Sequence, residues 1–195
     1  MKKEKEEILK KNNIDIEYLK PNYECSLCKD TGYIQKDDYR TEMCSCLKQK
    51  LLDISFNKSN MSNLNKENFS TFNENLFSDE VNPNKYRFAI SPRENIRNIK
   101  QKSLEFVQNF DNPNSKNLLF TGNTGLGKTF LSNCIANEVL KMGKTVLYQT
   151  APVLLENIID YKLSKQKSNL EDINKSVLET DLLIIDDLGT ETLNS

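Results

Sequence analysis

The most constraining feature of the sequence is the octapeptide GNTGLGKT at residues 122–129. It has the spacing G-x-x-x-x-G-K-T of a phosphate-binding (Walker A) loop, in which backbone N–H groups surround the phosphates of a nucleotide. Three of the six glycines in the chain fall within this span, where side chains would block the close approach of the backbone. The spacing therefore predicts nucleotide binding by a loop that joins a strand to a helix.

The flanking residues have the pattern that such a loop requires. Residues 117–120 form a short apolar run that is typical of a buried parallel strand. Residues 130–141 carry apolar side chains at helical spacing, so we expect a helix whose N-terminus faces the phosphates. We expect Lys128 to reach the β- and γ-phosphates and the Thr129 hydroxyl to bind Mg²⁺. The expected nucleotide contacts are Gly122, Asn123, Thr124, Gly125, Leu126, Gly127, Lys128, Thr129 and Phe130.

A second motif, LLIIDD at residues 182–187, is an apolar strand that ends in two carboxylates. Open α/β sheets bind ligands at the carboxyl ends of their strands, so this motif is interpreted as a Walker B segment. Asp186 is expected to hold Mg²⁺ through water, and Asp187 to polarise the attacking water. Phosphoryl transfer needs a cation, a metal and an oriented water, which makes Lys128, Asp186 and Asp187 the catalytic candidates. The chain contains no histidine, which excludes histidine-based catalysis.

Helices and strands alternate along this half of the chain. Ser91-Pro-Arg-Glu predicts a helix start, with a serine N-cap, proline at the first position and glutamate at the third. The apolar spacing continues that helix to about residue 110, and residues 145–148 predict a second strand. Another helix is expected from Pro152 onward. This order predicts an α/β fold with parallel strands.

Four cysteines form a separate cluster with the spacing C-x₂-C-x₁₅-C-x-C. Zinc prefers four tetrahedral ligands and binds thiolates well, so the spacing favours structural zinc. An iron–sulfur cluster and reduced cysteines without a metal are the alternatives. Cys134 lies between apolar residues of the expected helix, where we expect a small buried hydrophobe. The expected zinc ligands are Cys25, Cys28, Cys44 and Cys46.

Five stretches together resemble the bacterial replicative-helicase loaders of the DnaC/DnaI type and the related IstB-like transposition ATPases. The resemblance implies an AAA+ P-loop ATPase with a three-layer sandwich, preceded by a small Cys₄ zinc module. It also implies ATP, Mg²⁺ and Zn²⁺ as cofactors, and a hexameric replicative helicase, single-stranded DNA and further copies of the chain as partners. The stretches are CSLCKDTGYI at 25–34, CSCLKQKL at 44–51, SPRENI at 91–96, LLFTGNTGLGKTFLSNCIA at 118–136 and DLLIIDDLG at 181–189.

The resemblance divides the chain into three parts: a helical and zinc-binding helicase-interaction module at 1–56, a linker at 57–90, and an ATPase domain at 91–195. AAA+ proteins order their strands 5-1-4-3-2, and the sequence offers strands 1, 2 and 3 only. Strand 4, expected between strands 1 and 3, is missing, as are the sensor, arginine finger and lid. We therefore expect a product truncated after the Walker B segment, with negligible ATP hydrolysis by itself.

Two other functions fit the same motifs. An IstB-like transposition helper would use the same ATPase with a transposase, and a zinc adaptor would keep the nucleotide site only as a regulatory switch. The net charge of −1 neither supports nor excludes a DNA contact. No apolar stretch approaches the roughly 20 residues of a membrane span, and residues 1–7 lack the apolar region of a signal peptide. The expected location is the cytoplasm.

Overall fold

Residues 2–36, 39–54, 66–163 and 175–190 are described by the computed structural model. The chain forms two compact units, Met1–Cys44 and Ser45–Ser195. Within the described residues the first unit contains an antiparallel pair of strands and the second a parallel pair. The parallel pair belongs to the unit that carries both nucleotide motifs.

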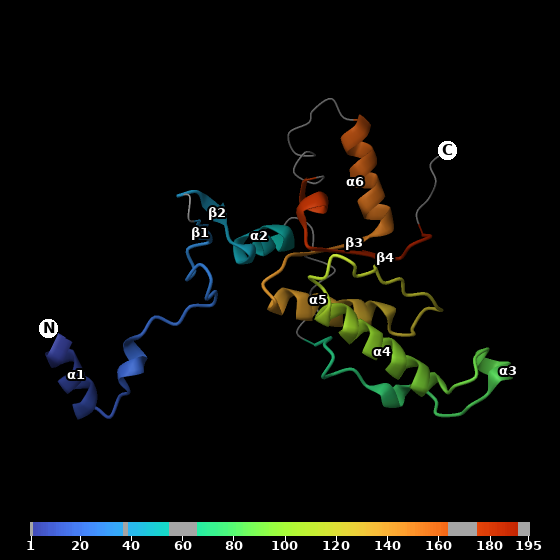
Figure 1. The fold of residues 1–195 in the computed structure, drawn as a ribbon, viewed down its shortest axis with the longest axis horizontal. Helices are drawn as coiled ribbons and strands as arrows, with labels where there is room; N and C mark the ends of the chain where they lie inside the picture. Colours follow the sequence, from blue (N-terminus) through green and yellow to red (C-terminus); the bar gives the residue numbers. More distant parts are fainter. Residues whose placement is uncertain (1, 37–38, 55–65, 164–174, 191–195) are drawn as a thin grey trace. The chain divides into compact units, whose positions relative to one another are not determined.

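The first unit is built from short elements (Figure 1). Its two strands form a small hairpin in which Tyr33 lies opposite Met43. Gly32 precedes the hairpin with a φ of 77°, a left-handed conformation that favours glycine, and its carbonyl accepts a hydrogen bond of 2.8 Å from the Cys44 N–H. The elements are α1 (Lys2–Lys11), the 3₁₀ helix η1 (Ile16–Leu19), β1 (Tyr33–Gln35) and β2 (Thr41–Met43).

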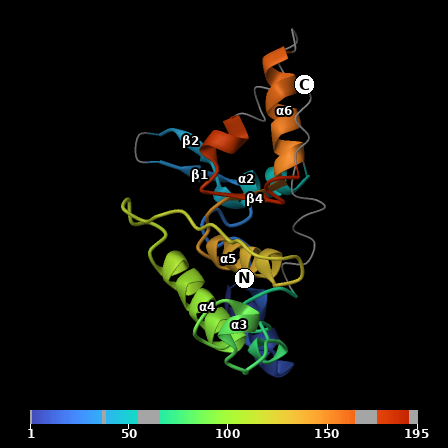
Figure 2. The ribbon, with the colours of Figure 1, turned by 90° about the vertical axis from the view of Figure 1, so that its right-hand side faces the viewer.

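The second unit has helices on both faces of its strand pair (Figures 1 and 2). Strands β3 and β4 run parallel, with Val146 opposite Leu182 and Thr150 opposite Asp186. Helix α5 lies on one face and α6 on the other, and α4 packs outside α5. Its elements are α2 (Ser45–Leu52), η3 (Glu74–Leu76), α3 (Pro83–Tyr86), α4 (Pro92–Gln108), α5 (Lys128–Lys141), β3 (Val146–Thr150), α6 (Ala151–Leu163) and β4 (Leu182–Asp186).

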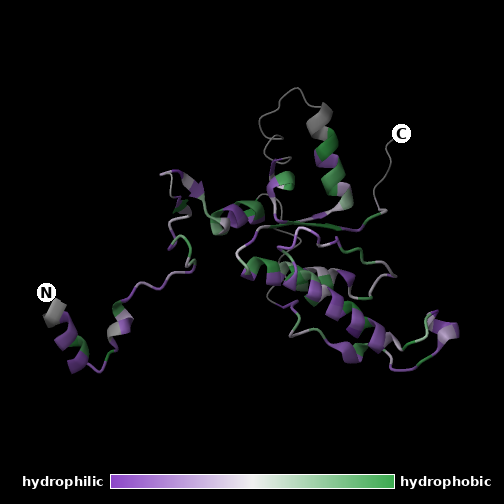
Figure 3. Cartoon of the chain, viewed as in Figure 1, coloured by the Kyte–Doolittle hydropathy of each residue, from purple (hydrophilic) through white to green (hydrophobic). Residues whose placement is uncertain are grey.

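The core of this unit lies between α5 and the strands. Ile135, Ala136 and Val139 of α5 pack with Val146 of β3, and all four are buried. Burial of this apolar face holds α5 against the sheet, which fixes where the phosphate-binding loop ends. Figure 3 shows the outer helix α4 as largely hydrophilic, whereas α5 carries more hydrophobic residues.

Helix α4 begins where its capping residues predict. The Ser91 Oγ accepts a hydrogen bond of 3.2 Å from the Glu94 N–H, and Pro92 occupies the first turn. This arrangement satisfies one of the backbone donors that a helix N-terminus leaves unpaired. Among the described residues, no helix is long and apolar enough to cross a membrane.

The strand expected at residues 117–120 does not form as expected. Within the described ranges these residues belong to no β-ladder, and β4 pairs with β3 alone. Phe120 still packs on the core, whereas Leu119 is 73% exposed. The expected buried strand is therefore wrong: residues 117–119 are exposed and only Phe120 is partly buried. Burial of such a run also needs a neighbouring strand within hydrogen-bonding distance.

The two compact units are divided between Cys44 and Ser45, because helix α2 packs on β3. The expected boundary of the helicase-interaction module at residue 56 stays a prediction. The Gln49 side chain of α2 pairs with the backbone of Val146, accepting from its N–H at 2.7 Å and donating to its carbonyl at 3.1 Å. The side-chain amide of Gln49 thus makes the hydrogen bonds that a neighbouring strand would make, and it covers the outer edge of β3 at Val146.

The described part of the expected linker, residues 66–90, packs on the ATPase unit. Glu74 forms ion pairs with Arg97 at 3.0 Å and Lys100 at 3.2 Å, and these contacts with the two cations lower the pKa of its carboxyl group. Phe72 contacts Phe130 at a centroid distance of 5.6 Å. Spaced single aromatics in a polar stretch carry no periodic signal, which is why the pattern indicates a linker. Residues 57–65 lie outside the described residues.

Replacing Gln49 with alanine should destabilise the second unit. The change removes both hydrogen bonds to Val146 and leaves buried backbone groups without these partners, so we expect the free energy of unfolding to fall by about 1–3 kcal/mol. Lys48→Ala, an exposed neighbour on the same helix, is the matched control and should change stability by less than about 0.5 kcal/mol. Urea unfolding followed by circular dichroism measures both, and equal stabilities would contradict the edge-covering role.

Candidate functional site

The phosphate-binding loop has the backbone conformation that its glycines predict. Gly125 and Gly127 have φ values of 81° and 83°, and a Cβ atom at either position would point into open space. Helix α5 follows directly, and no side chain caps its N-terminus at Gly127. An uncapped helix N-terminus presents backbone N–H groups and a positive dipole end to an anion. The loop residues therefore fit a nucleotide phosphate.

Lys128 lies over its own loop. Its Nζ donates hydrogen bonds of 3.0 Å to the carbonyl oxygens of Gly122 and of Asn123. These bonds hold the ammonium group at the mouth of the loop, where phosphate oxygens can replace the two carbonyl groups as acceptors. The lysine is thus positioned by the loop itself.

The two motifs meet at Thr129 and Asp186. The Thr129 hydroxyl donates a hydrogen bond of 2.9 Å to Asp186 Oδ2, although the two residues are 57 positions apart. Helix α5 supplies the threonine, and the carboxyl end of β4 supplies the aspartate. Hydroxyl and carboxylate oxygens are the hard ligands that Mg²⁺ prefers, so this pair fits the metal that accompanies a nucleotide.

Asp186 is held as a carboxylate by several donors. Its partial burial would raise its pKa, but hydrogen bonds from the Tyr148 hydroxyl, Thr129 and the Asp187 N–H, together with the nearby charge of Lys128, lower the pKa below its ordinary value. The net effect favours the ionised form at neutral pH. An ionised carboxylate is the form that binds a metal.

Tyr148 is a site residue that the sequence analysis missed. It lies in β3, it is 2% exposed, and its hydroxyl donates a hydrogen bond of 2.6 Å to Asp186 Oδ2. In the run TVLY it has the pattern of an ordinary core residue. The signal that could have found it is its register, because Tyr148 pairs with Ile184, two residues before Asp186.

Asp187 follows β4 in an unusual backbone conformation. Its φ is 56°, a left-handed value that aspartate tolerates better than most residues, and its N–H donates to Asp186 Oδ1 at 2.9 Å. The Thr190 hydroxyl donates to its carbonyl at 2.7 Å. The residue is exposed, so water and ligand can reach it.

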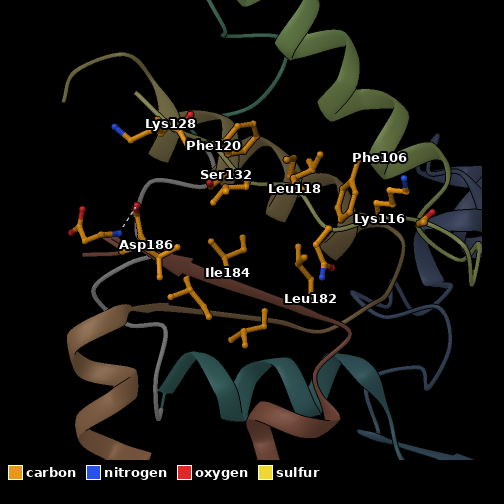
Figure 4. Close-up of a pocket in the computed structure, with 18 of the residues that line it drawn as sticks. Phe106, Lys116, Leu118, Phe120, Lys128, Ser132, Leu182, Ile184 and Asp186 are labelled. Atoms are coloured by element: carbon orange, nitrogen blue, oxygen red, sulfur yellow. Dashed lines mark hydrogen bonds between the residues drawn. The ribbon is translucent and has the colours of Figure 1, made fainter. Parts of the chain in front are cut away.

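A cavity of about 910 Å³ adjoins these residues, and most of its lining comes from residues 115–122 and 181–188. It reaches from the apolar part of β4 to both nucleotide motifs, since Gly122, Lys128 and Asp186 also line it. Figure 4 shows the side chains of Leu118 and Phe120 on one side and those of Leu182, Ile184 and Asp186 on the other. The cavity therefore separates residues 117–120 from the open edge of β4.

Of the expected nucleotide contacts, Gly122 and Lys128 line this cavity. Thr124 and Leu126 are exposed on the loop, where a ligand can reach them. Phe130 instead points to Phe72, against which its ring packs edge-on. Its expected nucleotide contact stays a prediction that involves its backbone, not its ring.

The four clustered cysteines come together as their spacing predicts. The Sγ atoms of Cys25, Cys28, Cys44 and Cys46 all lie within 4.8 Å of one another. Tetrahedral zinc with Zn–S bonds of about 2.3 Å places its sulfur ligands about 3.8 Å apart. Cys25 Sγ and Cys44 Sγ lie 3.8 Å apart, so the cluster fits a zinc ion.

Backbone hydrogen bonds hold this cluster in shape. The Gly32 N–H donates to Cys28 Sγ at 3.3 Å, a contact that stabilises a thiolate. The Asp30 carboxylate accepts from the backbone N–H groups of Cys25 at 2.8 Å and Glu24 at 3.2 Å, which closes the turn between the first two cysteines. These contacts arise within the sequence ECSLCKDTG at residues 24–32 and need no distant partner.

Cys134 differs from the other cysteines. It is fully buried in α5, and burial, with the nearby negative charge of Glu67, raises its pKa to about 12. A thiol with this pKa stays protonated at neutral pH and is unreactive. The expectation of a buried, inert cysteine agrees with this geometry.

The site can now be compared with known proteins. The sequence profile of the family described as "IstB-like ATP binding protein" matches residues 49–195. The chain belongs to this family. Membership supports ATP binding by residues 49–195, in agreement with the meeting of the two motifs at Thr129 and Asp186.

Several curated proteins are similar to part of this IstB-like chain. The "Replicative helicase loader DnaC" of Escherichia coli (strain K12) is 33% identical over 95 residues, which cover 49% of the chain and 38% of the loader. The protein of the same name from Buchnera aphidicola subsp. Baizongia pistaciae is 33% identical over 89 residues, 46% of the chain and 36% of that loader. The "Chromosomal replication initiator protein DnaA" of Aliarcobacter butzleri is 34% identical over 71 residues, 36% of the chain and 16% of the initiator. No solved structure matches the chain significantly.

Thiol labelling should separate the clustered cysteines from Cys134. In zinc-loaded protein at pH 8 we expect slow labelling of all five, because zinc protects four thiolates and burial protects the fifth. After chelation the four clustered thiols should react at least about 100-fold faster than Cys134, because at a pKa of about 12 little thiolate forms. Mass spectrometry of labelled peptides measures the rates, with unfolded protein as the control in which all five react. Equal rates before and after chelation would contradict a zinc site.

Proposed function

We propose that this chain carries the ATP-binding and ATP-hydrolysing site of a loader of the replicative DNA helicase. The observation that carries the ATPase part is the hydrogen bond of 2.9 Å between Thr129 and Asp186. It joins a phosphate-binding loop to an acidic strand end, which is the arrangement that phosphoryl transfer requires. The profile match over residues 49–195 supports the same activity.

Each residue of the site has a separate role in ATP hydrolysis. The N–H groups of the loop and of the start of α5 bind the phosphates, and Lys128 exchanges its two loop carbonyls for phosphate oxygens. Thr129 and Asp186 would hold Mg²⁺. The bound ion would neutralise part of the negative charge of the phosphates. The exposed Asp187 carboxylate orients the attacking water. The four cysteines would hold a structural zinc ion, which stabilises the fold around residues 25–46.

The helicase-loading part rests on the relatives and on the surface of the first unit. Two of the similar proteins are named replicative helicase loaders. The described part of the first unit exposes large apolar side chains, among them Ile8 at 61%, Tyr18 at 77% and Leu19 at 56%. Contiguous exposed apolar surface is typical of a protein-binding site, and the elements α1 and η1 that carry these side chains contact each other. We place the helicase contact there, with single-stranded DNA and self-association assigned to the ATPase unit.

A second function keeps the same ATPase. An IstB-like transposition helper would act with a transposase, and the description of the matching family favours it. A zinc adaptor with a regulatory nucleotide site would bind ATP without turnover. Helicase binding separates the loader from the transposition helper, and ATP turnover separates either from the adaptor.

Nucleotide binding should depend on Lys128. Lys128→Ala removes a cation that faces the phosphates, so we expect ATP affinity to fall by about 2–4 kcal/mol. Lys141→Ala, at the other end of the same helix, is the matched control, because among the described residues its ammonium group pairs with Glu138. Equilibrium titration with a fluorescent ATP analogue measures both. Equal affinity in the parent and Lys128→Ala would reject the assigned site.

Helicase binding should depend on the apolar surface of the first unit. The double change Ile8→Asp with Leu19→Asp places charges on two exposed apolar positions, and we expect binding to the hexameric helicase to weaken at least about tenfold. ATP binding should be unchanged. Lys10→Ala, an exposed polar change on the same helix, is the control. Biolayer interferometry with immobilised helicase measures binding, and no binding by the parent chain would overturn the loader proposal.

A further inference from the structure

The Tyr148 hydroxyl is placed to control the orientation of Asp186. It donates to Asp186 Oδ2 at 2.6 Å, and the Thr129 hydroxyl donates to the same oxygen at 2.9 Å. The Asp187 N–H occupies the other carboxylate oxygen at 2.9 Å. Three donors from three segments therefore fix both the position and the rotation of one carboxylate.

These hydrogen bonds leave acceptor capacity on one of the two carboxylate oxygens of Asp186. Each carboxylate oxygen accepts about two hydrogen bonds. Asp186 Oδ2 already accepts two, whereas Oδ1 accepts one from Asp187 among the described residues. The Tyr148 hydroxyl thereby directs the remaining acceptor capacity of the carboxylate to Oδ1.

The tyrosine is itself held rigidly. It is 2% exposed and lies in β3, whose ladder with β4 sets its distance from Asp186. The phenol hydrogen of Tyr148 faces a carboxylate oxygen of Asp186, which can only accept when ionised, so the hydroxyl is the donor of this hydrogen bond. Phenylalanine would fill the same apolar space without this hydrogen bond. The hydroxyl thus has a role that packing alone does not require.

We propose that Tyr148 is a positioning residue that orients Asp186 toward the metal shared with Thr129, and so sets how strongly Mg²⁺ and nucleotide bind together. The inference rests on the proposed nucleotide site. It adds a residue that belongs to neither sequence motif and that acts through Asp186.

The test compares nucleotide affinity with and without Mg²⁺. A fluorescent ATP analogue is titrated into the parent chain and into Tyr148→Phe, in EDTA and in saturating Mg²⁺. We expect the metal-free affinity to stay within about twofold, because the loop and Lys128 are untouched. The gain in affinity that Mg²⁺ provides should fall at least about fivefold, as expected for loss of a hydrogen bond to a charged group.

Thr145→Val is the matched control. Thr145 immediately precedes the same strand, is 4% exposed, and its hydroxyl donates a hydrogen bond of 2.7 Å to the Asp181 carboxylate, at the opposite end of β4. Its loss should lower stability and leave the effect of Mg²⁺ on nucleotide affinity unchanged. A decrease in that effect equal to that of Tyr148→Phe would show a general weakening of the strand pair and overturn the inference.

A double-mutant cycle with Asp186→Asn tests whether Tyr148 acts through Asp186. In the Asp186→Asn background, Tyr148→Phe should cause no further loss of the Mg²⁺ effect, because the oriented carboxylate is already gone. Additive losses would overturn the inference, as would equal losses of affinity with and without metal. A parent chain that binds no nucleotide would instead reject the proposed function. A parent with a clear Mg²⁺ effect that Tyr148→Phe retains would reject only the role of Tyr148.

Discussion

The hydrogen bond between Thr129 and Asp186 is the contact on which the candidate site depends. It exists because α5 packs its apolar face on the sheet while β4 runs parallel to β3. Parallel strands bring their carboxyl ends to one edge of a sheet, and a helix that follows a glycine-rich loop presents its N-terminus at that edge. Packing in the core thereby sets the geometry of a polar site at the surface.

The two outer edges of the strand pair differ in what covers them. Gln49 covers the edge of β3 by pairing with the backbone of Val146. The other edge, on β4, faces the cavity that separates it from residues 117–120. An uncovered strand edge offers unpaired backbone groups to any extended segment that reaches it. The loop next to this cavity is therefore held mainly by α5 and by the packing of Phe120.

The first unit is small, so its stability depends on more than apolar packing. A unit of 44 residues buries too little apolar surface to be stable by packing alone, and small domains commonly depend on a metal or on disulfides. The clustered cysteines form no disulfide among the described residues, and Gly32 and Asp30 shape the turn around them. A metal at this position would stabilise the unit while its apolar side chains stay exposed for a partner.

The sequence by itself determined the phosphate-binding loop, the acidic strand end, the cysteine cluster and the start of α4 at Ser91. Each is a local pattern in which spacing and residue type dictate the conformation, so each could be predicted. Only the tertiary structure decided the roles of Tyr148 and Gln49, the packing of residues 66–90 and the missing ladder at residues 117–120. The physical reason is that a tyrosine in an apolar run, or a glutamine in a charged helix, acquires its role from a partner distant in sequence. No periodicity in the chain specifies that partner.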